Sequence, residues 1–540
     1  MIDRRQFVGL GAWAAGAAAT GVWSGAFAQG ASAPAEGATV ETTAGKIRGA
    51  KLGKVQAFKG VPYGASTAPP NRFMPPQKPQ PWTGVRDTMR LGNRSPQLLT
   101  DFHGFVPPEV EAMDRNETLS EDCLMLNVWT PAVGAGKRPV MVWLHGGGYT
   151  SGSGGFICYD GAELAGKHDV VVVTVNHRLS VFGYLYLAGL GSQKYASASN
   201  VGQLDIVAAL EWVRDNIGAF GGDASNVTVF GQSGGGGKVS TLLAMPSAKG
   251  LFHRAIVQSG ASIRGLTPDA GTKTAEEFLS RLSLTPKDVD KLQTFSMEQI
   301  LATSDTLQNK RPPLNTAPLV DGHSLPVHPF DPSAPTQSAD IPLLIGTTET
   351  EVTFFPGTQI DPIDDADLRK RVKGMVRKAS DAQVEQLIAA YRSGRPKDSN
   401  TDLFLIMSSD GGFRSGVLTE ADRKAQQKAA VYQYYFTWRS PVREGKLRSY
   451  HTLEIPFVFD NVDNCQSMTG NGKDRYPLAD RMAKAWVAFA RTGNPNHAGL
   501  PKWGAFDTTK RTTMVFDKEC KVVNDPHGEE QKLLRSLQSL

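Results

Sequence analysis

The chain has 540 residues, of which 40% are hydrophobic and 21% are charged, a composition typical of globular proteins. Its formal net charge is only +5 and the basic residues are dispersed, so we expect no nucleic-acid partner. Length alone would suggest roughly three or four domains.

The N-terminus has the features of an export signal. Arg4 and Arg5 precede an Ala/Gly-rich apolar stretch over 8–27, and a small-x-small pattern ends at Ala28. Paired arginines before a weakly apolar stretch resemble a bacterial Tat signal, so 1–28 is predicted to be a signal peptide cleaved after Ala28. A single transmembrane anchor is the alternative, and the weak hydrophobicity and the cleavage pattern count against it.

A Gly/Ala/Ser/Pro linker follows over 29–38, and 39–540 should form the mature protein. No other stretch approaches 18 apolar residues, so we expect no stable membrane association after cleavage. The mature protein should be periplasmic or secreted. In an oxidising compartment, Cys123, Cys158, Cys465 and Cys520 allow three pairings, and the absence of a C-x-x-C pair indicates no metal or redox site.

Strands alternate with helices along the rest of the chain. Apolar runs without alternation are typical of strands buried on both faces of a parallel sheet. Such runs predict strands over 124–130, 139–144, 169–175, 227–230, 253–258, 343–346 and 432–438. Short strands with turns are also expected over 39–60. Helical patterns cover 204–217, 272–300, 365–391 (as a pair) and 479–491. We therefore expect an α/β fold around one mostly parallel sheet with helices on both faces.

A G-x-S-x-G motif over 231–235 follows one of these strands. Glycines permit a sharp strand-to-helix turn, which would expose the hydroxyl of Ser233 at a helix N-terminus. A phosphate-binding loop ending at Lys238 is the alternative. That motif needs glycine at 232 and Ser or Thr at 239, and the chain has Gln232 and Val239.

Three consecutive glycines, Gly146, Gly147 and Gly148, follow the strand over 139–144. Their unobstructed N–H groups suit an oxyanion hole for a tetrahedral intermediate. A flexible surface loop would also be rich in glycine, but its position directly after a core strand favours the oxyanion hole.

Several further stretches carry a family resemblance. They are 58–63 (Phe-Lys-Gly-Val-Pro-Tyr), 121–124 (Glu-Asp-Cys-Leu), 176–179 (Asn-His-Arg-Leu), 219–223 (Ala-Phe-Gly-Gly-Asp) and 258–260 (Gln-Ser-Gly). Together with the two glycine motifs, the chain resembles the type-B carboxylesterases, the family of para-nitrobenzyl esterases and cholinesterases. The resemblance covers nearly all of the mature chain. It implies a single α/β-hydrolase domain, a small-molecule ester substrate and no cofactor or metal.

The resemblance also implies the other catalytic residues. The family order is Ser, acid, His, and its acid loop pattern Asp-Glu-Gly selects Glu351, although Thr350 and Val352 depart from it. Glu349 remains the rival on sequence alone. His451 precedes Glu-Ile in the family's His-x-x-Glu-Ile segment and is the implied general base.

The resemblance assigns an expected role to each of these residues. Ser233 is the nucleophile, His451 the base and Glu351 its orienting acid. The N–H groups of Gly147, Gly148 and Gly234 form the oxyanion hole. Ser259 resembles a serine that hydrogen-bonds the catalytic acid.

The resemblance also implies two ion pairs, and the sequence differs from the family at one cysteine. Arg178 with Asp205, and Arg72 with Glu121, match structural ion pairs of the family. The family commonly pairs the cysteine at 123 with an upstream cysteine, but here that position is Ser95, so the usual disulfide is not carried over.

We therefore expect a serine esterase that works through an acyl-enzyme. The same machinery acting on an amide, a carbonate or a lactone is the alternative. A non-catalytic binding homologue is a distant one, because such proteins typically lack the nucleophile.

Overall fold

The computed structural model describes residues 35–98, 117–308, 314–355 and 357–539. The predicted signal peptide, 1–28, lies outside the described residues. Strand β1 (Glu36–Thr42) begins two residues before the predicted end of the linker, because Glu36 already pairs with Ala50 of β2 (Gly45–Leu52). Residues 36–38 therefore belong to the sheet and not to a linker.

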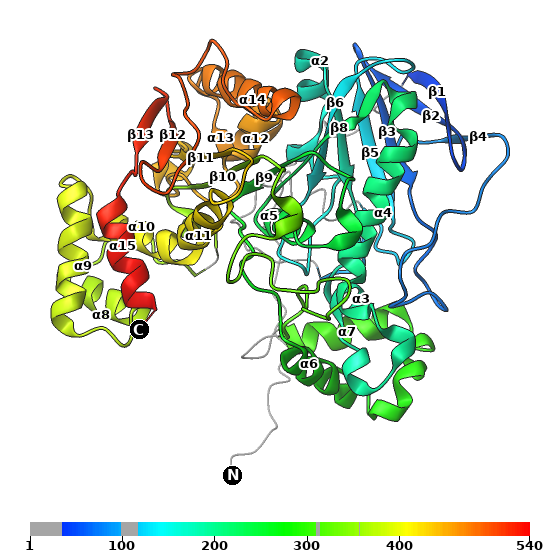
Figure 1. Cartoon of the computed structure of the whole chain (residues 1–540), viewed down its shortest axis with the longest axis horizontal. Coiled ribbons are helices and arrows are strands. Elements are labelled where there is room, and N and C mark those ends of the chain that lie inside the picture. Colours follow the sequence, from blue (N-terminus) through cyan, green and yellow to red (C-terminus); the bar gives the residue numbers. More distant parts are fainter. Residues whose placement is uncertain (1–34, 99–116, 309–313, 356, 540) are drawn as a thin grey trace, which may run out of the picture. The chain divides into compact units, whose positions relative to one another are not determined.

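A single 13-stranded sheet runs through the described chain (Figure 1). Its centre is parallel, in the spatial order β7 (Val171–Val175), β6 (Arg138–Leu144), β8 (Gly222–Gln232), β9 (Arg254–Gln258), β10 (Leu343–Thr348), β11 (Val431–Phe436), β12 (Thr512–Phe516). Antiparallel strands extend it at one edge, namely β1, β2, β3 (Val55–Pro62) and β5 (Met125–Thr130), and β13 (Lys521–Asn524) extends the other. The short β4 (Val85–Asp87) pairs with β2. The predicted mostly parallel sheet is confirmed.

Strand β6 shows why the central runs do not alternate. Val140, Val142 and Leu144 belong to one apolar core, and Met141 and Trp143 belong to another. Successive side chains of a strand point to opposite faces, so both faces of β6 must be apolar.

Helices cover both faces of the sheet, as predicted. The core that holds Val140 also contains side chains of α4 (Val201–Asn216), α5 (Gly234–Leu242) and α11 (Ser415–Lys424). The core that holds Trp143 contains side chains of α2 (Ala162–His168), α12 (Ile455–Val458) and α14 (Arg475–Thr492).

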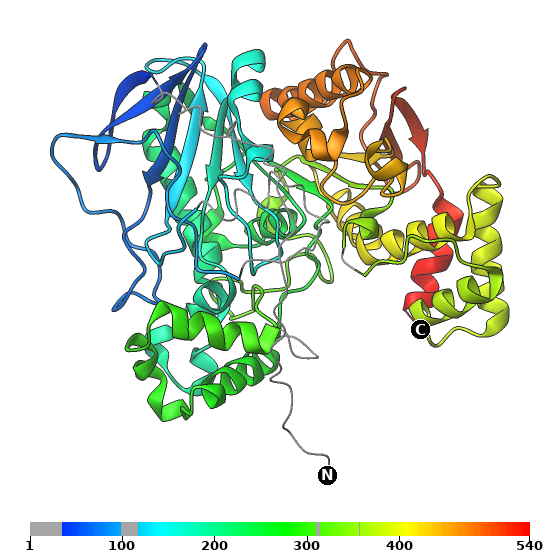
Figure 2. The same ribbon diagram turned by 180° about the vertical axis from the view of Figure 1, so that it is seen from behind.

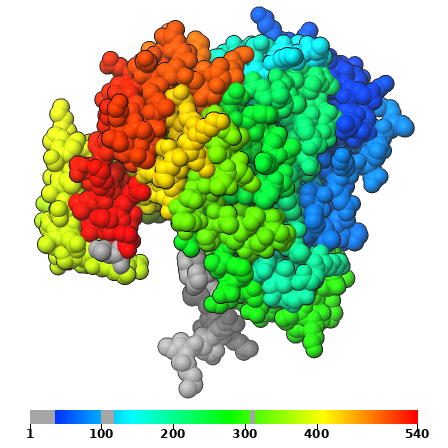
Figure 3. All heavy atoms as spheres, in the orientation of Figure 1, coloured from blue at the N-terminus to red at the C-terminus, as the bar shows by residue number. Residues whose placement is uncertain are grey.

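Two further helical groups have apolar clusters of their own. Helices α8 (Asp365–Met375), α9 (Asp381–Gly394), α10 (Asn400–Ser409) and α15 (Gly528–Gln538) share one cluster. In the space-filling view α15, in red, lies against the yellow α8–α9 segment (Figure 3). The other cluster joins α3 (Ser180–Tyr184), α6 (Pro268–Arg281) and α7 (Met297–Gln308). Figure 2 shows the ribbons of this green and teal region from behind.

The prediction of one continuous helical stretch over 272–300 is wrong. Helix α6 ends at Arg281, and Ser283 has a φ of 57°, outside the helical region. Thr285 and Asp288 then form a capping box that starts the separate 3₁₀ segment η7 (Pro286–Gln293). The cap and the proline begin a new element here.

Both predicted ion pairs are formed in the interior. Arg178 Nη2 lies 2.6 Å from Asp205 Oδ1, and Arg72 Nη2 lies 2.6 Å from Glu121 Oε2. All four side chains are buried, so removing one partner would leave an uncompensated charge.

Three of the four cysteines are buried, at two places, and Cys520 is half-buried. Cys123 is buried near Ser95, and burial raises the pKa of its thiol. Cys158 and Cys465 are also buried, and their Sγ atoms lie 2.7 Å apart. Within the described residues no group of His, Cys, Asp and Glu could hold a metal ion, and no helix is long and apolar enough to cross a membrane.

Candidate active site

Ser233 occupies a strained turn between β8 and α5. Its φ of 58° and ψ of −127° lie outside the regions that side chains ordinarily adopt. Its N–H donates to the Gln258 carbonyl (2.8 Å), and its carbonyl accepts from the Gly237 N–H (3.0 Å). A Cβ on Gly235 would lie 1.9 Å from the Leu144 carbonyl oxygen, so only glycine permits this close approach of α5 to β6. The predicted strand–turn–helix context of the serine is therefore present.

Glu351 and His451 are in direct contact although they are 100 residues apart. His451 Nδ1 lies 2.5 Å from Glu351 Oε2, and both side chains are buried, at 2% and 0% exposure. The other carboxylate oxygen, Oε1, accepts from the Thr348 N–H at 2.8 Å. Because an ionised carboxylate only accepts hydrogen bonds, Nδ1 carries the proton and Nε2 keeps a lone pair.

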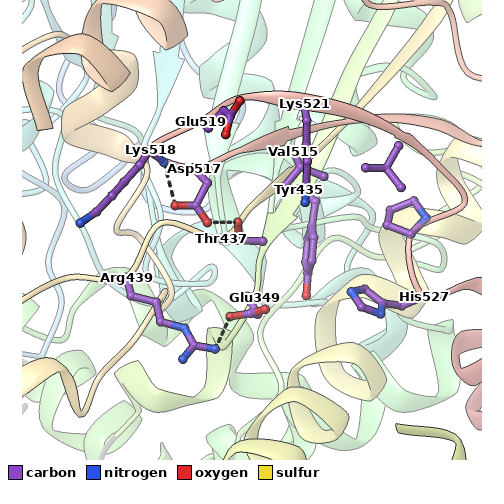
Figure 4. Close-up of a pocket in the computed structure, with 12 residues that line it drawn as sticks. Glu349, Tyr435, Thr437, Arg439, Val515, Asp517, Lys518, Glu519, Lys521 and His527 are labelled. Atoms are coloured by element: carbon purple, nitrogen blue, oxygen red, sulfur yellow. Dashed lines mark hydrogen bonds and ion pairs between the residues drawn. The ribbon is translucent and has the colours of Figure 1, made fainter. Parts of the chain in front are cut away.

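The rival carboxylate, Glu349, faces elsewhere. Its side chain lies 3.2 Å from Arg439 and points into a cavity of about 740 Å³ (Figure 4). Burial raises its pKa. Neither Ser233 nor His451 lines this cavity. The structure thus brings Glu351, and not Glu349, to the histidine.

The loop after β6 presents peptide N–H groups to the surface. The Gly147 carbonyl accepts from the N–H groups of Thr150 (3.3 Å) and Ser151 (3.1 Å), and the Gly146 carbonyl lies 2.9 Å from His145 Nδ1. In a trans peptide the N–H points opposite to the carbonyl. The N–H groups of Gly148 and Gly147 therefore point away from these partners, and both residues are exposed.

This glycine loop packs directly on the start of α5. A Cβ on Gly234 would lie 2.1 Å from the Gly148 carbonyl oxygen, so the loop and the turn that holds Ser233 are in contact. The structure thus places Gly148 against Gly234, which follows Ser233 directly, and Gly147 is the preceding residue of the same loop.

Ser233 and His451 are not hydrogen-bonded to each other in this structure. Gln232, the residue before the serine, places its Nε2 atom 3.2 Å from both ring nitrogens of His451. Contacts between nucleophile and base are often long without substrate and tighten when it binds. From sequence, Gln232 served only to exclude a phosphate-binding loop, although its place inside the serine motif puts it close to the nucleophile.

The expected hydrogen bond from Ser259 to the catalytic acid is not formed. Ser259 Oγ is buried and makes no hydrogen bond to any described residue. The backbone of Ser259, with a φ of 50°, donates its N–H to the Gly346 carbonyl at 2.8 Å. Glu351 takes its second hydrogen bond from the Thr348 N–H instead.

A second buried carboxyl lies behind the pair. Burial, followed by the negative charge of Glu351, raises the pKa of Glu454 to about 8. Glu454 Oε1 accepts from Gln258 Nε2 at 3.2 Å. The neutral acid at this position avoids placing two carboxylates together in the core.

Three phenylalanine rings surround the His451 ring. The ring centroids of Phe354, Phe355 and Phe413 lie 5.8, 5.3 and 4.9 Å from it, and all three side chains are half-buried. Phe413 belongs to a π-helical turn, Asp410–Arg414, between α10 and α11. Phe413 was not predicted as a site residue, because a π-helical turn leaves no clear periodicity in the sequence.

A half-buried hydroxyl, an imidazole bonded to a carboxylate and exposed glycine N–H groups are the components of nucleophilic acyl transfer. Comparison with known proteins points to the same chemistry. The family model described as "Carboxylesterase family" matches residues 36–533. A para-nitrobenzyl esterase of Bacillus subtilis is 36% identical over 510 residues, covering 92% of this chain and 98% of that protein.

Solved structures agree. A Geobacillus stearothermophilus carboxylesterase has a TM-score of 0.78 and 36% identity, covering 92% of this chain and 99% of its own. A Clostridium hathewayi esterase, described as able to hydrolyse aliphatic aromatic polyesters, has a TM-score of 0.79 and 32% identity, with 93% and 98% covered. The chain therefore belongs to the carboxylesterase family and is a hydrolase of carboxylic esters.

Proposed function

We propose that Ser233, His451 and Glu351 form the catalytic triad of this esterase. The observation that carries the proposal is the 2.5 Å contact between His451 Nδ1 and Glu351 Oε2, which leaves Nε2 as the base. Ser233 Oγ attacks the ester carbonyl while His451 takes its proton. Glu351 holds the ring and stabilises the imidazolium without being protonated.

The N–H groups of Gly147, Gly148 and Gly234 receive the oxyanion of the tetrahedral intermediate. His451 then returns the proton to the leaving alcohol, and an acyl-enzyme remains on Ser233. Water, activated by the same histidine, attacks this acyl group and releases the acid. No cofactor enters these steps.

A stoichiometric label tests the assignment. A fluorophosphonate should modify one residue per chain, and peptide mass spectrometry should place it on Ser233. Pre-steady-state assays with a para-nitrophenyl ester should show a burst of one nitrophenol per labelled site. A label on another residue, or turnover that survives complete labelling, would contradict the proposal.

We propose esters with an aromatic or bulky apolar group as the preferred substrates. Phe354, Phe355 and Phe413 offer half-buried rings beside His451, and aromatic side chains favour such groups. Relatives named for para-nitrobenzyl esters and for aliphatic aromatic polyesters fit this preference. An ester panel that varies acyl length and alcohol bulk tests it, and Phe413→Ala should selectively reduce kcat/KM for the aromatic members.

Amides, carbonates and lactones remain the alternative substrates for the same triad. Ester and amide pairs that share one acyl group separate the two possibilities. A higher kcat/KM for the amide would displace the ester assignment for the natural substrate.

We also propose export through a Tat-type signal with cleavage after Ala28. The support is the Arg4-Arg5 pair before a weakly apolar stretch. N-terminal sequencing of protein from the periplasmic fraction should begin at Gln29. A chain that still begins at Met1 and is found in membranes would indicate an anchor.

A further inference from the structure

Lys238 is a fully buried lysine in α5, five residues after Ser233. Its Nζ donates to two backbone carbonyls, those of His145 (2.9 Å) and Gly148 (3.0 Å). It also lies 5.6 Å from the centre of the Tyr149 ring. A buried ammonium is costly unless its hydrogen bonds are satisfied, so these contacts hold both the lysine and the loop in place.

The two carbonyls lie at the two ends of the glycine loop. The peptides between them are Gly146–Gly147 and Gly147–Gly148, whose N–H groups belong to Gly147 and Gly148. A single ammonium thus fixes the loop at both ends and joins it to the helix that begins beside Ser233.

Lys238 has no carboxylate partner among the described residues, and burial alone lowers its pKa, to about 7. Two neutral imidazoles lie near it. His145 and His177 stack at 4.8 Å, and burial followed by the charge of Lys238 lowers the pKa of both. A buried cation without a counter-ion is stabilised by any negative charge that forms nearby.

Lys424 offers an informative contrast. It is equally buried, and its Nζ donates to the Ser338 carbonyl at 2.6 Å. Its pKa is lowered to about 8 by burial, while the negative charges of Asp340 and Glu420 act in the opposite direction. Lys424 thus has acidic neighbours and, within the described residues, makes no hydrogen bond to the glycine loop. Among the same residues Lys238 has no acidic neighbour, and it hydrogen-bonds two carbonyls of that loop.

We infer that Lys238 is a positioning residue for the oxyanion hole. It aligns the N–H groups of Gly147 and Gly148 relative to Ser233, and in its protonated form it favours the oxyanion that forms there. This inference rests on the proposed function of Ser233 and of the glycine loop. Lys238 thus stabilises the transition state and not the bound ester.

The test compares Lys238→Met with the matched control Lys424→Met. Each variant removes a buried ammonium and keeps an unbranched apolar chain. Active sites are counted with a fluorophosphonate, so that misfolded protein does not enter the rates. Acylation is followed with a para-nitrophenyl ester, and the affinity for an aryl trifluoromethyl ketone, whose adduct with serine carries an oxyanion, is measured beside it.

Removing one direct oxyanion donor typically costs about 10²–10³-fold in kcat. Because Lys238 acts through the loop, we expect acylation per active site to fall by about 10–100-fold in Lys238→Met. Ketone affinity should fall by a similar factor, with little change in KM. Lys424→Met should lose thermal stability but keep both values near the wild type. A purely structural role for Lys238 would give the Lys424→Met pattern and would overturn the inference.

Lys238→Gln serves if Lys238→Met does not fold. Its amide can still donate to one of the two carbonyls but has no charge, so a smaller loss in the same two measurements is expected. Wild-type values would again overturn the inference. If the wild-type label falls outside Ser233, the proposed function itself fails. If the label is on Ser233 and the variants behave as wild type, only the role of Lys238 fails.

Discussion

Replacing Glu351 with glutamine should abolish most of the activity while changing the shape of the site very little. In the wild type, Oε1 accepts from the Thr348 N–H at 2.8 Å and Oε2 contacts His451 Nδ1 at 2.5 Å. The Thr348 N–H can only donate, so the amide oxygen of the glutamine must face it. The amide NH₂ then faces His451.

This arrangement forces the wrong histidine tautomer. Since the NH₂ group is a donor, Nδ1 must accept and the ring proton moves to Nε2. Nε2 can then no longer take the proton of Ser233. In serine proteases the equivalent carboxylate-to-amide change lowers kcat by about 10⁴-fold, or about 5 kcal/mol of transition-state stabilisation. We expect a loss of that order in Glu351→Gln.

Glu349→Gln is the matched control, because it makes the same chemical change two residues away. Glu349 contacts Arg439 at a cavity wall and does not reach His451, so kcat should stay close to the wild type. Glu349→Gln removes the charged partner of Arg439, so some loss of thermal stability is expected without a matching loss of kcat. Steady-state hydrolysis of a para-nitrophenyl ester, normalised by active-site titration and accompanied by thermal melts, measures both variants. A large loss in Glu349→Gln with activity retained in Glu351→Gln would refute the reasoning.

Three further outcomes are expected. Ser233→Ala should fold normally and lose about 10⁴-fold or more in kcat together with the burst, and retention of a tenth of the activity would argue against the nucleophile. The pKa of Glu454 is raised to about 8 in the folded state, whereas in the unfolded chain a glutamate has a pKa of about 4.3. The folded state therefore holds a proton that the unfolded chain releases. The stability that this proton contributes is lost as the pH rises through about 8. The stability of Glu454→Gln relative to the wild type, from urea unfolding at pH 5 and pH 8, should therefore increase with pH, and a decrease would contradict this sign. After exposure to an oxidising buffer, Cys158 and Cys465 should pair, so that the thiol count in denaturant falls from four to two; a different pair in the peptide map would exclude it.

The parts of the site that could be predicted depend on local sequence. A strand buried on both faces is apolar at its buried positions, so β6 and β7 are visible as nearly unbroken apolar runs. In β8 only 227–230 stands out, because 223–226 (Asp-Ala-Ser-Asn) is largely polar and at least partly exposed. The turn at Ser233 needs glycines where α5 approaches β6, and these glycines stand in the motif itself. Both signals lie within a few residues of the group that they position.

The parts that could not be predicted depend on contacts between distant segments. The sequence places Glu349 and Glu351 on the same loop after β10, and only the turn that begins at Glu351 decides which one meets His451. In the sequence, Lys238 stands out only as the end of a phosphate motif that the chain does not complete, and its two carbonyl partners lie 93 and 90 residues away. No local pattern reports such a contact.

The register of the sheet explains why these distant segments meet. The last residue of β6, Leu144, pairs with Gly231 of β8, and Gln232 pairs with Gln258 of β9. Thr348, at the end of β10, is level with Phe436, at the end of β11. Because these strands are parallel, the segments that leave them emerge at the same edge, and they carry the glycine loop, Ser233, Glu351 and His451 in turn. A register shift of one residue in β8 would turn its side chains to the opposite face and move the serine turn relative to the glycine loop. The register of the sheet therefore sets where these four segments lie relative to one another.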